Sequence, residues 1–199
     1  MSSDKGRTSA PPIRLERLFA WIEKKDRQRY GIRPLTAGGV GGWGFIRHHG
    51  PEVTLRDGTR VRPGDPVIAP HVTNDAMAEL TRSGWQSEII RRGLADLREL
   101  AAVVAAMDPA DRPVALWGAT ILWPFAKREG WEVRERPRTL RVRMEDWYLR
   151  GVLRRWAKEG GRRMRRGRGQ LRTRDCWLST TELLTRFGPE TPPDPRIAR

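Results

Sequence analysis

Residues 55–74 read LRDGTRVRPGDPVIAPHVTN, and this stretch decides how the rest of the chain is expected to fold. In it, Asp57-Gly58 joins a residue that tolerates the left-handed backbone region to one that favours it. The pair predicts a two-residue hairpin turn between Thr54-Leu55 and Arg60-Val61. Pro63-Gly64-Asp65-Pro66 then closes the hairpin, because the second proline pushes Asp65 into an extended conformation that starts a buried strand.

Outward from this stretch, the chain alternates between strand and helix patterns. Apolar residues repeat at helical spacing over residues 86–107, which predicts one long helix with a continuous apolar side. The glycine-rich residues 37–44 lead into an expected strand, and no helix or Lys-Ser/Thr pair follows them, which excludes a phosphate-binding loop. Strands are expected over 45–49, 67–69, 114–118, 131–133 and 176–178, and further helices between 12 and 31 and over 75–81, 120–129, 146–158 and 183–187.

The chain shows no internal repeat and no second apolar core. We therefore expect one compact α/β or α+β domain, with a mixed sheet, an N-terminal hairpin region and packed helices. The domain should span residues 14–188, between a disordered leader over 1–13 and a disordered tail over 189–199.

Composition narrows the setting in which the protein is expected to work. A single cysteine among 199 residues excludes an internal disulfide, and Cys176 lies in an apolar run typical of a core residue. Residues 1–12 lack the apolar centre of a secretory signal, and no window approaches the roughly 18 apolar residues of a membrane span. The expected location is the cytoplasm.

Positive charge is concentrated late in the chain. Residues 150–174 hold ten arginines and one lysine against Glu159 alone, so ten of the fifteen net positive charges lie there. Such density predicts an anionic polymer as partner, either nucleic acid or a cell-envelope polymer, although a solvated basic loop would explain it equally well. The candidate binding residues are Arg154, Arg155, Arg162, Arg163, Arg165, Arg166, Arg168 and Arg172.

Tryptophans lie beside and within this basic segment. Trp147 and Trp156 could stack on bases or sugars, whereas core packing is the alternative for most of the nine tryptophans in the chain.

An enzymatic alternative depends on His71. This histidine follows a strand pattern and precedes a helix start, where α/β folds place ligands, so it is a candidate acid or base acting on a glycan or a phosphorylated small molecule. Asp65 and Asp57 are candidate catalytic partners, and Asn74 is a candidate pocket residue. Structural roles compete: the aspartates occupy positions that favour turn hydrogen bonds, and His71 could fasten its own loop.

No cofactor or metal site is expected. His48 and His49 should point to opposite sides of a strand, and no spacing of histidine and cysteine supplies the roughly four ligands that zinc needs.

Several short motifs also occur in a characteristic order along the chain. They are Arg29-Tyr30-Gly31-Ile32-Arg33-Pro34, Leu55-Arg56-Asp57-Gly58, Gly64-Asp65-Pro66-Val67, His71 with Asn74, Trp177-Leu178-Ser179 and Leu183-Leu184-Thr185-Arg186-Phe187-Gly188. The order resembles the YkoP-like domain, a bacterial family found alone or as an extension of polysaccharide deacetylases. The resemblance spans roughly residues 15–188 and implies a fold more than an activity.

Two departures from that family pattern bear on function. Here Pro70-His71 and Thr73-Asn74 replace a Leu-His pair before two asparagines, and Trp123-Pro124-Phe125 stands where relatives have Leu-His-Arg-Gly. A second family histidine is therefore absent. The resemblance, through its deacetylase extensions, favours an envelope polymer over nucleic acid, and we expect binding rather than catalysis.

Overall fold

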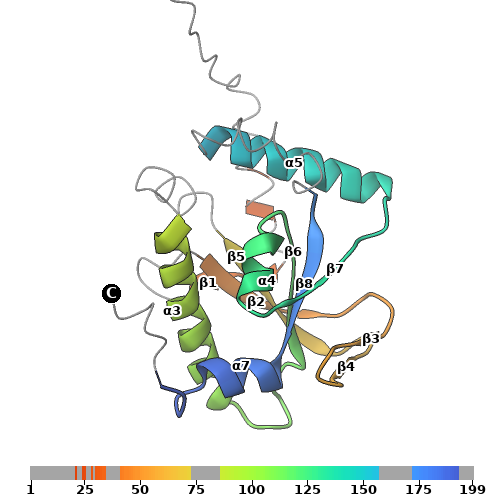
Figure 1. The fold of residues 1–199 in the computed structure, drawn as a ribbon. Coiled ribbons are helices and arrows are strands. Elements are labelled where there is room, and N and C mark those ends of the chain that lie inside the picture. The colour runs from red at the N-terminus through yellow and green to blue at the C-terminus, as the bar shows by residue number, and fades with distance from the viewer. Residues whose placement is uncertain are drawn as a thin grey trace, which may run out of the picture.

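A six-stranded mixed sheet in the order β1-β2-β5-β6-β8-β7 forms the centre of the molecule, and the two-stranded hairpin β3-β4 lies beside it (Figure 1). This computed structural model describes residues 21, 24, 25, 28, 30–34, 41–72, 86–156 and 172–192. The strands are β1 Arg33–Pro34, β2 Gly41–Arg47, β3 Val53–Thr54, β4 Arg60–Val61, β5 Pro66–Val72, β6 Ala115–Thr120, β7 Glu132–Arg134 and β8 Arg174–Ser179. The helices are α3 Gln86–Ala105, α4 Trp123–Arg128, α5 Leu140–Trp156 and α7 Thr180–Phe187.

The long helix α3 connects the one parallel pair of strands. It joins β5 to β6, which pair through Val67 with Ala115 and Ile68 with Leu116, while all other neighbours in the sheet are antiparallel. Because helices and both strand orientations combine in one domain, the expected single α/β or α+β domain with a mixed sheet is confirmed.

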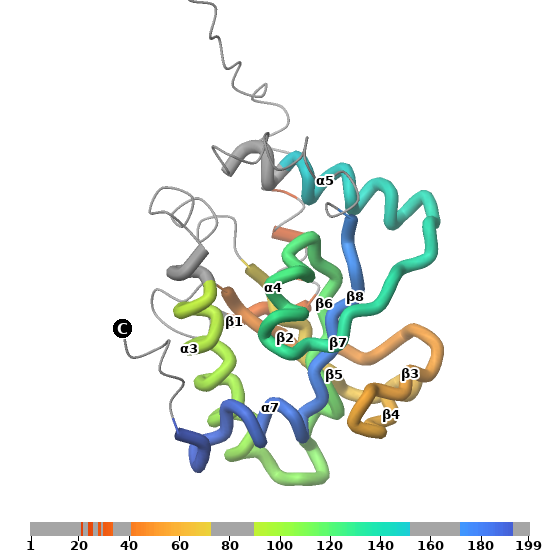
Figure 2. The backbone as a smooth tube through the Cα atoms, viewed as in Figure 1, coloured from red at the N-terminus to blue at the C-terminus, as the bar shows by residue number. Residues whose placement is uncertain are grey.

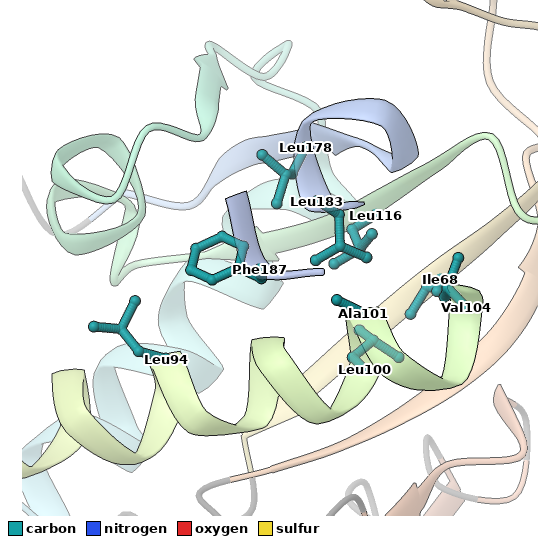
Figure 3. Close-up of a cluster of buried hydrophobic side chains, with 9 residues drawn as sticks. All are labelled: Ile68, Leu94, Leu100, Ala101, Val104, Leu116, Leu178, Leu183 and Phe187. Atoms are coloured by element: carbon teal, nitrogen blue, oxygen red, sulfur yellow. The ribbon is translucent and has the colours of Figure 1, made fainter. Parts of the chain in front are cut away.

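The main core lies between the sheet and the two helices α3 and α7. The predicted apolar side of α3 is confirmed, since Leu94, Ala101 and Val104 are buried against strand residues (Figure 3). α3 ends at Ala105, two residues before the expected end. The cluster comprises Ile68, Leu94, Leu100, Ala101, Val104, Leu116, Leu178, Leu183 and Phe187.

A second apolar cluster fills the other face of the sheet, beneath the hairpin. Its buried members are Leu55, Val61, Val67, Ala115 and Trp177. Alternate residues of β5 and β6 thus serve opposite faces, because successive side chains of a strand point to opposite sides.

The predicted hairpin forms between β3 and β4, but its loop is one residue longer than expected. The Leu55 amide donates to the Thr59 carbonyl at 2.8 Å, and the Gly58 amide donates to the Leu55 carbonyl at 2.9 Å. Gly58 has a φ of 85°, so it supplies the left-handed residue that completes a three-residue loop. Asp57 therefore sits before the left-handed position rather than in it.

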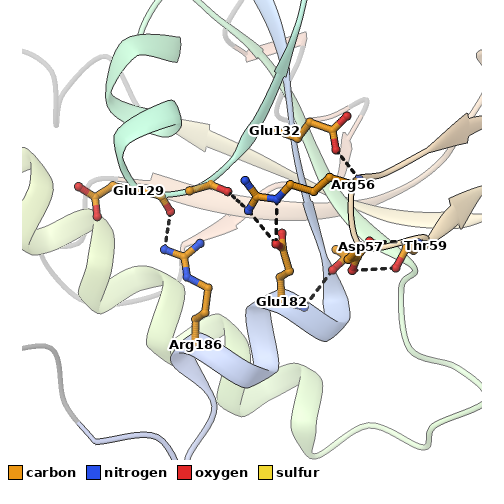
Figure 4. A network of polar contacts seen from close by, with 9 residues as sticks. Arg56, Asp57, Thr59, Glu129, Glu132, Glu182 and Arg186 are labelled. Carbon is orange, nitrogen blue, oxygen red and sulfur yellow. Dashed lines mark hydrogen bonds and ion pairs between the residues drawn. The ribbon is translucent and has the colours of Figure 1, made fainter.

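Polar contacts attach the hairpin loop to the body of the molecule (Figure 4). The Arg56 guanidinium donates to Glu182 at the start of α7, at 2.7 Å, and its amide donates to Glu132 of β7 at 2.8 Å. Ser179-Thr180-Thr181-Glu182 has the sequence of a capping box, and half of that box forms at α7. The Ser179 hydroxyl accepts from the Glu182 amide at 2.9 Å, while the Glu182 carboxylate binds Arg56 instead.

Residues 41–44 of the glycine-rich segment belong to a strand, contrary to the expectation that the strand begins at Phe45. β2 starts at Gly41 and pairs with β5 along its whole length. A Cβ on Gly42 or Gly44 would overlap the backbone carbonyls of Arg33 and Tyr30, which cross close over these positions. Glycine is required here by this close approach rather than by flexibility.

α5 begins six residues earlier than the sequence suggested and lies at the end of the sheet opposite α7 (Figure 2). α4 is shorter than expected, and β6, β7 and β8 differ from the predicted strands by a few residues. The helix expected over 75–81 lies outside the described residues, and the helix expected between 12 and 31 falls largely outside them.

The first residues of the expected C-terminal tail contact the domain. Arg98 of α3 donates to the Pro192 carbonyl at 3.3 Å, and the Thr191 hydroxyl donates to the Thr185 carbonyl at 3.0 Å. Residues 189–192 are thus tied to α3 and α7 by hydrogen bonds.

Candidate polyanion-binding face

The inward side of α5 carries both of its carboxylates. Thr139 caps the helix, its hydroxyl accepting from the Val142 amide at 3.3 Å. Glu145 pairs with Arg136 at 2.9 Å, and Asp146 accepts from both the amide and the hydroxyl of Thr173 at 2.7 Å. These bonds hold α5 against the start of β8, and they pair both carboxylates of the helix with groups of the domain.

Arg136 is the centre of this anchor. Its side chain is only 12% exposed, and besides Glu145 it reaches Asp175 at 3.2 Å. The indole of Trp117 also donates to Asp175, at 3.2 Å. Burial raises the pKa of Asp175 above its usual range, although Arg136 and Trp117 oppose the change. Arg136 therefore stabilises the charged form of this partly buried carboxyl group.

The outward side of α5 is apolar along its middle and basic at its edges. Leu140, Met144 and Trp147 are 73%, 64% and 58% exposed. Arg141 and Arg143 are exposed beside them. The sequence left both ligand stacking and core packing open for Trp147, and in the structure this residue is exposed rather than packed in the core.

The predicted arginines are only partly within the described residues. Arg154 and Arg155 lie in the last turn of α5, though their side chains lie outside the description, and Arg172 is exposed just before β8. Arg162, Arg163, Arg165, Arg166 and Arg168 fall outside the described residues. Along the chain, the basic segment therefore starts in α5 and ends at the start of β8, next to the anchor.

The candidate catalytic residues do not come together. His71 lies in β5 opposite Gly42, rather than after the strand, and is half-buried. Asp57 is hydrogen-bonded to Ser179, which lies level with Val67 across the sheet. Val67 is four residues, or about 13 Å along β5, from His71. Asp65 is six residues away, about 20 Å along the strand. Asn74 falls outside the described residues.

Both aspartates make hydrogen bonds within their own turns. Asp57 accepts from the amide and hydroxyl of Thr59 at 3.0 Å, and Asp65 accepts from the Arg62 amide at 2.7 Å. Partial burial raises the pKa of Asp57, but hydrogen bonds from Ser179 and Thr59 more than offset it, leaving the pKa below its usual range. An anion held this way is a poor general base near neutral pH.

Cysteine and histidine supply no alternative centre. Cys176 is 2% exposed, and burial and the nearby Asp175 raise the pKa of its thiol to about 12. His48 is buried, with its Nε2 atom 2.8 Å from the Pro51 carbonyl, whereas His49 is exposed. Within the described ranges, no three side chains of the metal-binding types gather into a cluster.

Sequence reasoning missed the residues that set the geometry of this face. Arg136, Asp146 and Thr173 are ordinary polar residues whose spacing carries no motif. Arg174, at the end of the basic segment, lies over the ring of Trp123 at 4.6 Å and pairs with Glu135 at 2.9 Å. One signal was available: Pro137 and Thr139 mark a helix start, which would have placed Leu140 and Met144 in α5.

Comparison with known protein families gives a match over most of the chain. The family model described as the YkoP domain matches residues 37–187. No curated protein and no solved structure matches the chain. In the part of the chain that the structure describes, no helix has the length and apolar character needed to cross a membrane.

Proposed function

We propose that this chain, which belongs to the YkoP domain family, is a binding or accessory module for a flexible anionic polymer with phosphodiester charges. The outer side of α5 and the arginine-rich segment after it would form the contact surface. A cytoplasmic setting, expected from the sequence, is part of the proposal.

The separation of charge on α5 carries this proposal. Its acidic side chains, Glu145 and Asp146, are bonded inward to Arg136 and Thr173, while Arg141 and Arg143 are exposed. A basic helix that merely kept the protein soluble would gain nothing from hiding its carboxylates. Here the hidden carboxylates leave a surface of one sign, which favours an anionic partner.

The chemistry of arginine suits phosphate in particular. A guanidinium can donate two parallel hydrogen bonds to a phosphate, and several in sequence can follow a flexible chain. Single-stranded nucleic acid and a poly(glycerol phosphate) of the cell envelope share this chemistry. Only the nucleic acid has bases, on which the exposed Trp147 could stack.

The test is charge reversal in the basic segment. Changing Arg162, Arg163, Arg165 and Arg166 to glutamate should weaken binding to both single-stranded DNA and poly(glycerol phosphate), with no loss of melting temperature. The logarithm of wild-type affinity for DNA should fall linearly with the logarithm of salt, by about 0.7 per phosphate contacted, and reversal should flatten this slope. Fluorescence anisotropy measures both quantities.

A matched control carries the same charge change elsewhere. It replaces Arg33, Arg47, Lys127 and Arg128, all exposed and all distant in sequence from the basic segment, with glutamate. If it weakens binding as much as the first variant does, net charge alone acts and no binding face exists. If binding changes with neither salt concentration nor charge reversal, the proposal is refuted. A preference for DNA over the glycerol polymer would identify nucleic acid as the ligand.

A further inference from the structure

Exposed apolar residues gather on one helix of this protein. Among the described residues, seven large apolar side chains are exposed, and three of them, Leu140, Met144 and Trp147, lie on α5. At about 100° per residue, these three fall within about 60° of one another around the helix. They form a single stripe, which we call the α5 stripe.

Arginines border the α5 stripe on both sides. By the same helical geometry, Arg143 lies about 40° from Trp147 on one side, and Arg141 lies about 60° from Met144 on the other. Both arginines are exposed, whereas Glu145 and Asp146 lie on the opposite side of the helix, bonded to the domain. The outward face is therefore apolar in the middle, basic at its margins and free of carboxylates.

From this arrangement we propose that α5 docks flat on the surface of an anionic lipid bilayer. The α5 stripe enters the boundary between head groups and acyl chains, and Arg141 and Arg143 contact lipid phosphates. A polymer ligand explains the arginines but leaves Leu140 and Met144 in water, so the apolar centre favours a bilayer. Trp147 suits this boundary because its ring is amphipathic.

The anchor beneath α5 makes the helix suitable for docking. Arg136 and Thr173 hold the inward carboxylates to the start of β8, so the helix is formed and oriented before it meets a surface. Figure 1 shows α5 lying across one end of the sheet, with α7 at the opposite end. Its outward face can approach a flat surface without obstruction from α7.

The first experiment measures binding to vesicles. Full-length protein is floated with vesicles of phosphatidylglycerol and phosphatidylcholine in equal parts, and with vesicles of phosphatidylcholine alone. We expect binding only to the anionic vesicles, and the Leu140→Gln/Met144→Gln variant should reduce partitioning about tenfold or more. The matched control, Val72→Gln/Val103→Gln, removes two exposed apolar side chains elsewhere and should bind like wild type.

A second measurement keeps the proposal testable if the double variant misfolds. In a Met144→Cys variant, an environment-sensitive fluorophore labels only the new site, because Cys176 is buried and its thiol pKa is raised to about 12. Anionic vesicles should shift the emission to the blue. Absence of binding, or binding with no shift and no effect of the glutamines, would overturn the proposal.

These outcomes separate the bilayer from the polymer. Vesicle binding that needs the α5 stripe, together with polymer binding that ignores charge reversal, would support lipid docking and refute the polymer-binding function. Polymer binding without vesicle binding would support the polymer-binding function and refute lipid docking. A fluorophore that responds to single-stranded DNA but not to vesicles would assign the α5 stripe to base stacking and overturn the lipid proposal.

Discussion

Gly58 shows how one residue can determine a turn without packing against anything. Its φ of 85° lies in the left-handed region, and a Cβ built there would meet no atom within 4 Å. Any cost of substitution therefore comes from the backbone alone. We expect Gly58→Val to lower the free energy of unfolding by about 1–2 kcal/mol, because a β-branched residue resists positive φ. Urea unfolding measures the change.

The control at this site is Gly58→Asn, since asparagine enters the left-handed region more readily than valine does. It should lose clearly less stability than the valine variant. Equal losses in the two variants would mean that a clash of the added side chain, rather than backbone strain, lowers the stability. The open space around Gly58 predicts no such clash. No loss in either would mean that the loop relaxes into another turn.

Single residues also mark the limit of what the sequence could predict. Asp57-Gly58 and Ser179 carry local signals for a turn and a helix cap, and the structure has both at these positions, although the hairpin loop is one residue longer than predicted. Such features can be predicted because turns and caps depend on neighbours in the chain. His71 depends instead on which strand lies beside it. Its place opposite Gly42, far from Asp57 and Asp65, follows from sheet pairing that no local pattern encodes. Acid–base chemistry by His71 alone stays a prediction.

At the scale of elements, Arg136 links α5 to the sheet. Arg136 bridges Glu145 of the helix and Asp175 of β8, and its side chain is 12% exposed. Replacing it with methionine would leave two partly buried carboxylates without their cation. We expect Arg136→Met to lower the free energy of unfolding by about 3 kcal/mol.

The penalty of Arg136→Met should depend on pH in a defined direction. The pKa of Asp175 is already raised by burial, and loss of the arginine raises it further. When the pKa of an acid is higher in the folded state than in the unfolded state, the free energy of unfolding falls as pH rises from the unfolded pKa, about 3.9, to the folded pKa. Urea unfolding at pH 7 and pH 4 should thus show the smaller penalty at pH 4.

Arg150→Met is the matched control on the same helix. Arg150 is 37% exposed and lies 3.8 Å from Asp146, so its replacement should cost no more than about 0.5 kcal/mol. Similar losses in both variants would mean that positive charge in general, rather than the Arg136 bridge, stabilises α5. An equal penalty for Arg136→Met at both pH values would remove Asp175 from the explanation.

The elements themselves were predicted with uneven success, for a physical reason. α3 was found nearly to the residue because its apolar side repeats over five turns against one core. β2 was misplaced because long-range contacts define it, whereas α5 was misplaced because its local cap signal was not used. The glycines of β2 are fixed by the backbone of residues 30–33, and the start of α5 needed attention to Thr139 rather than to apolar spacing.

At the scale of the whole molecule, excess positive charge opposes folding. The chain carries a net charge of +15, and described clusters such as Arg138, Arg141 and Arg143 lie exposed within a few residues of each other. Self-repulsion of this kind destabilises a compact state. Salt screens it, but salt also weakens ion pairs such as Arg60 with Glu52, so the two effects compete.

Repulsion should win this competition. Exposed pairs such as Arg60 with Glu52 contribute roughly 0–1 kcal/mol each, and the Arg136 bridge, being largely buried, is weakly screened. We therefore expect the melting temperature to rise when sodium chloride increases from about 20 to about 200 mM, as the Debye length falls from roughly 20 to roughly 7 Å. The variant with glutamate at 162, 163, 165 and 166 should show a flatter rise. A melting temperature that falls with salt in wild type would mean that the ion pairs outweigh the repulsion.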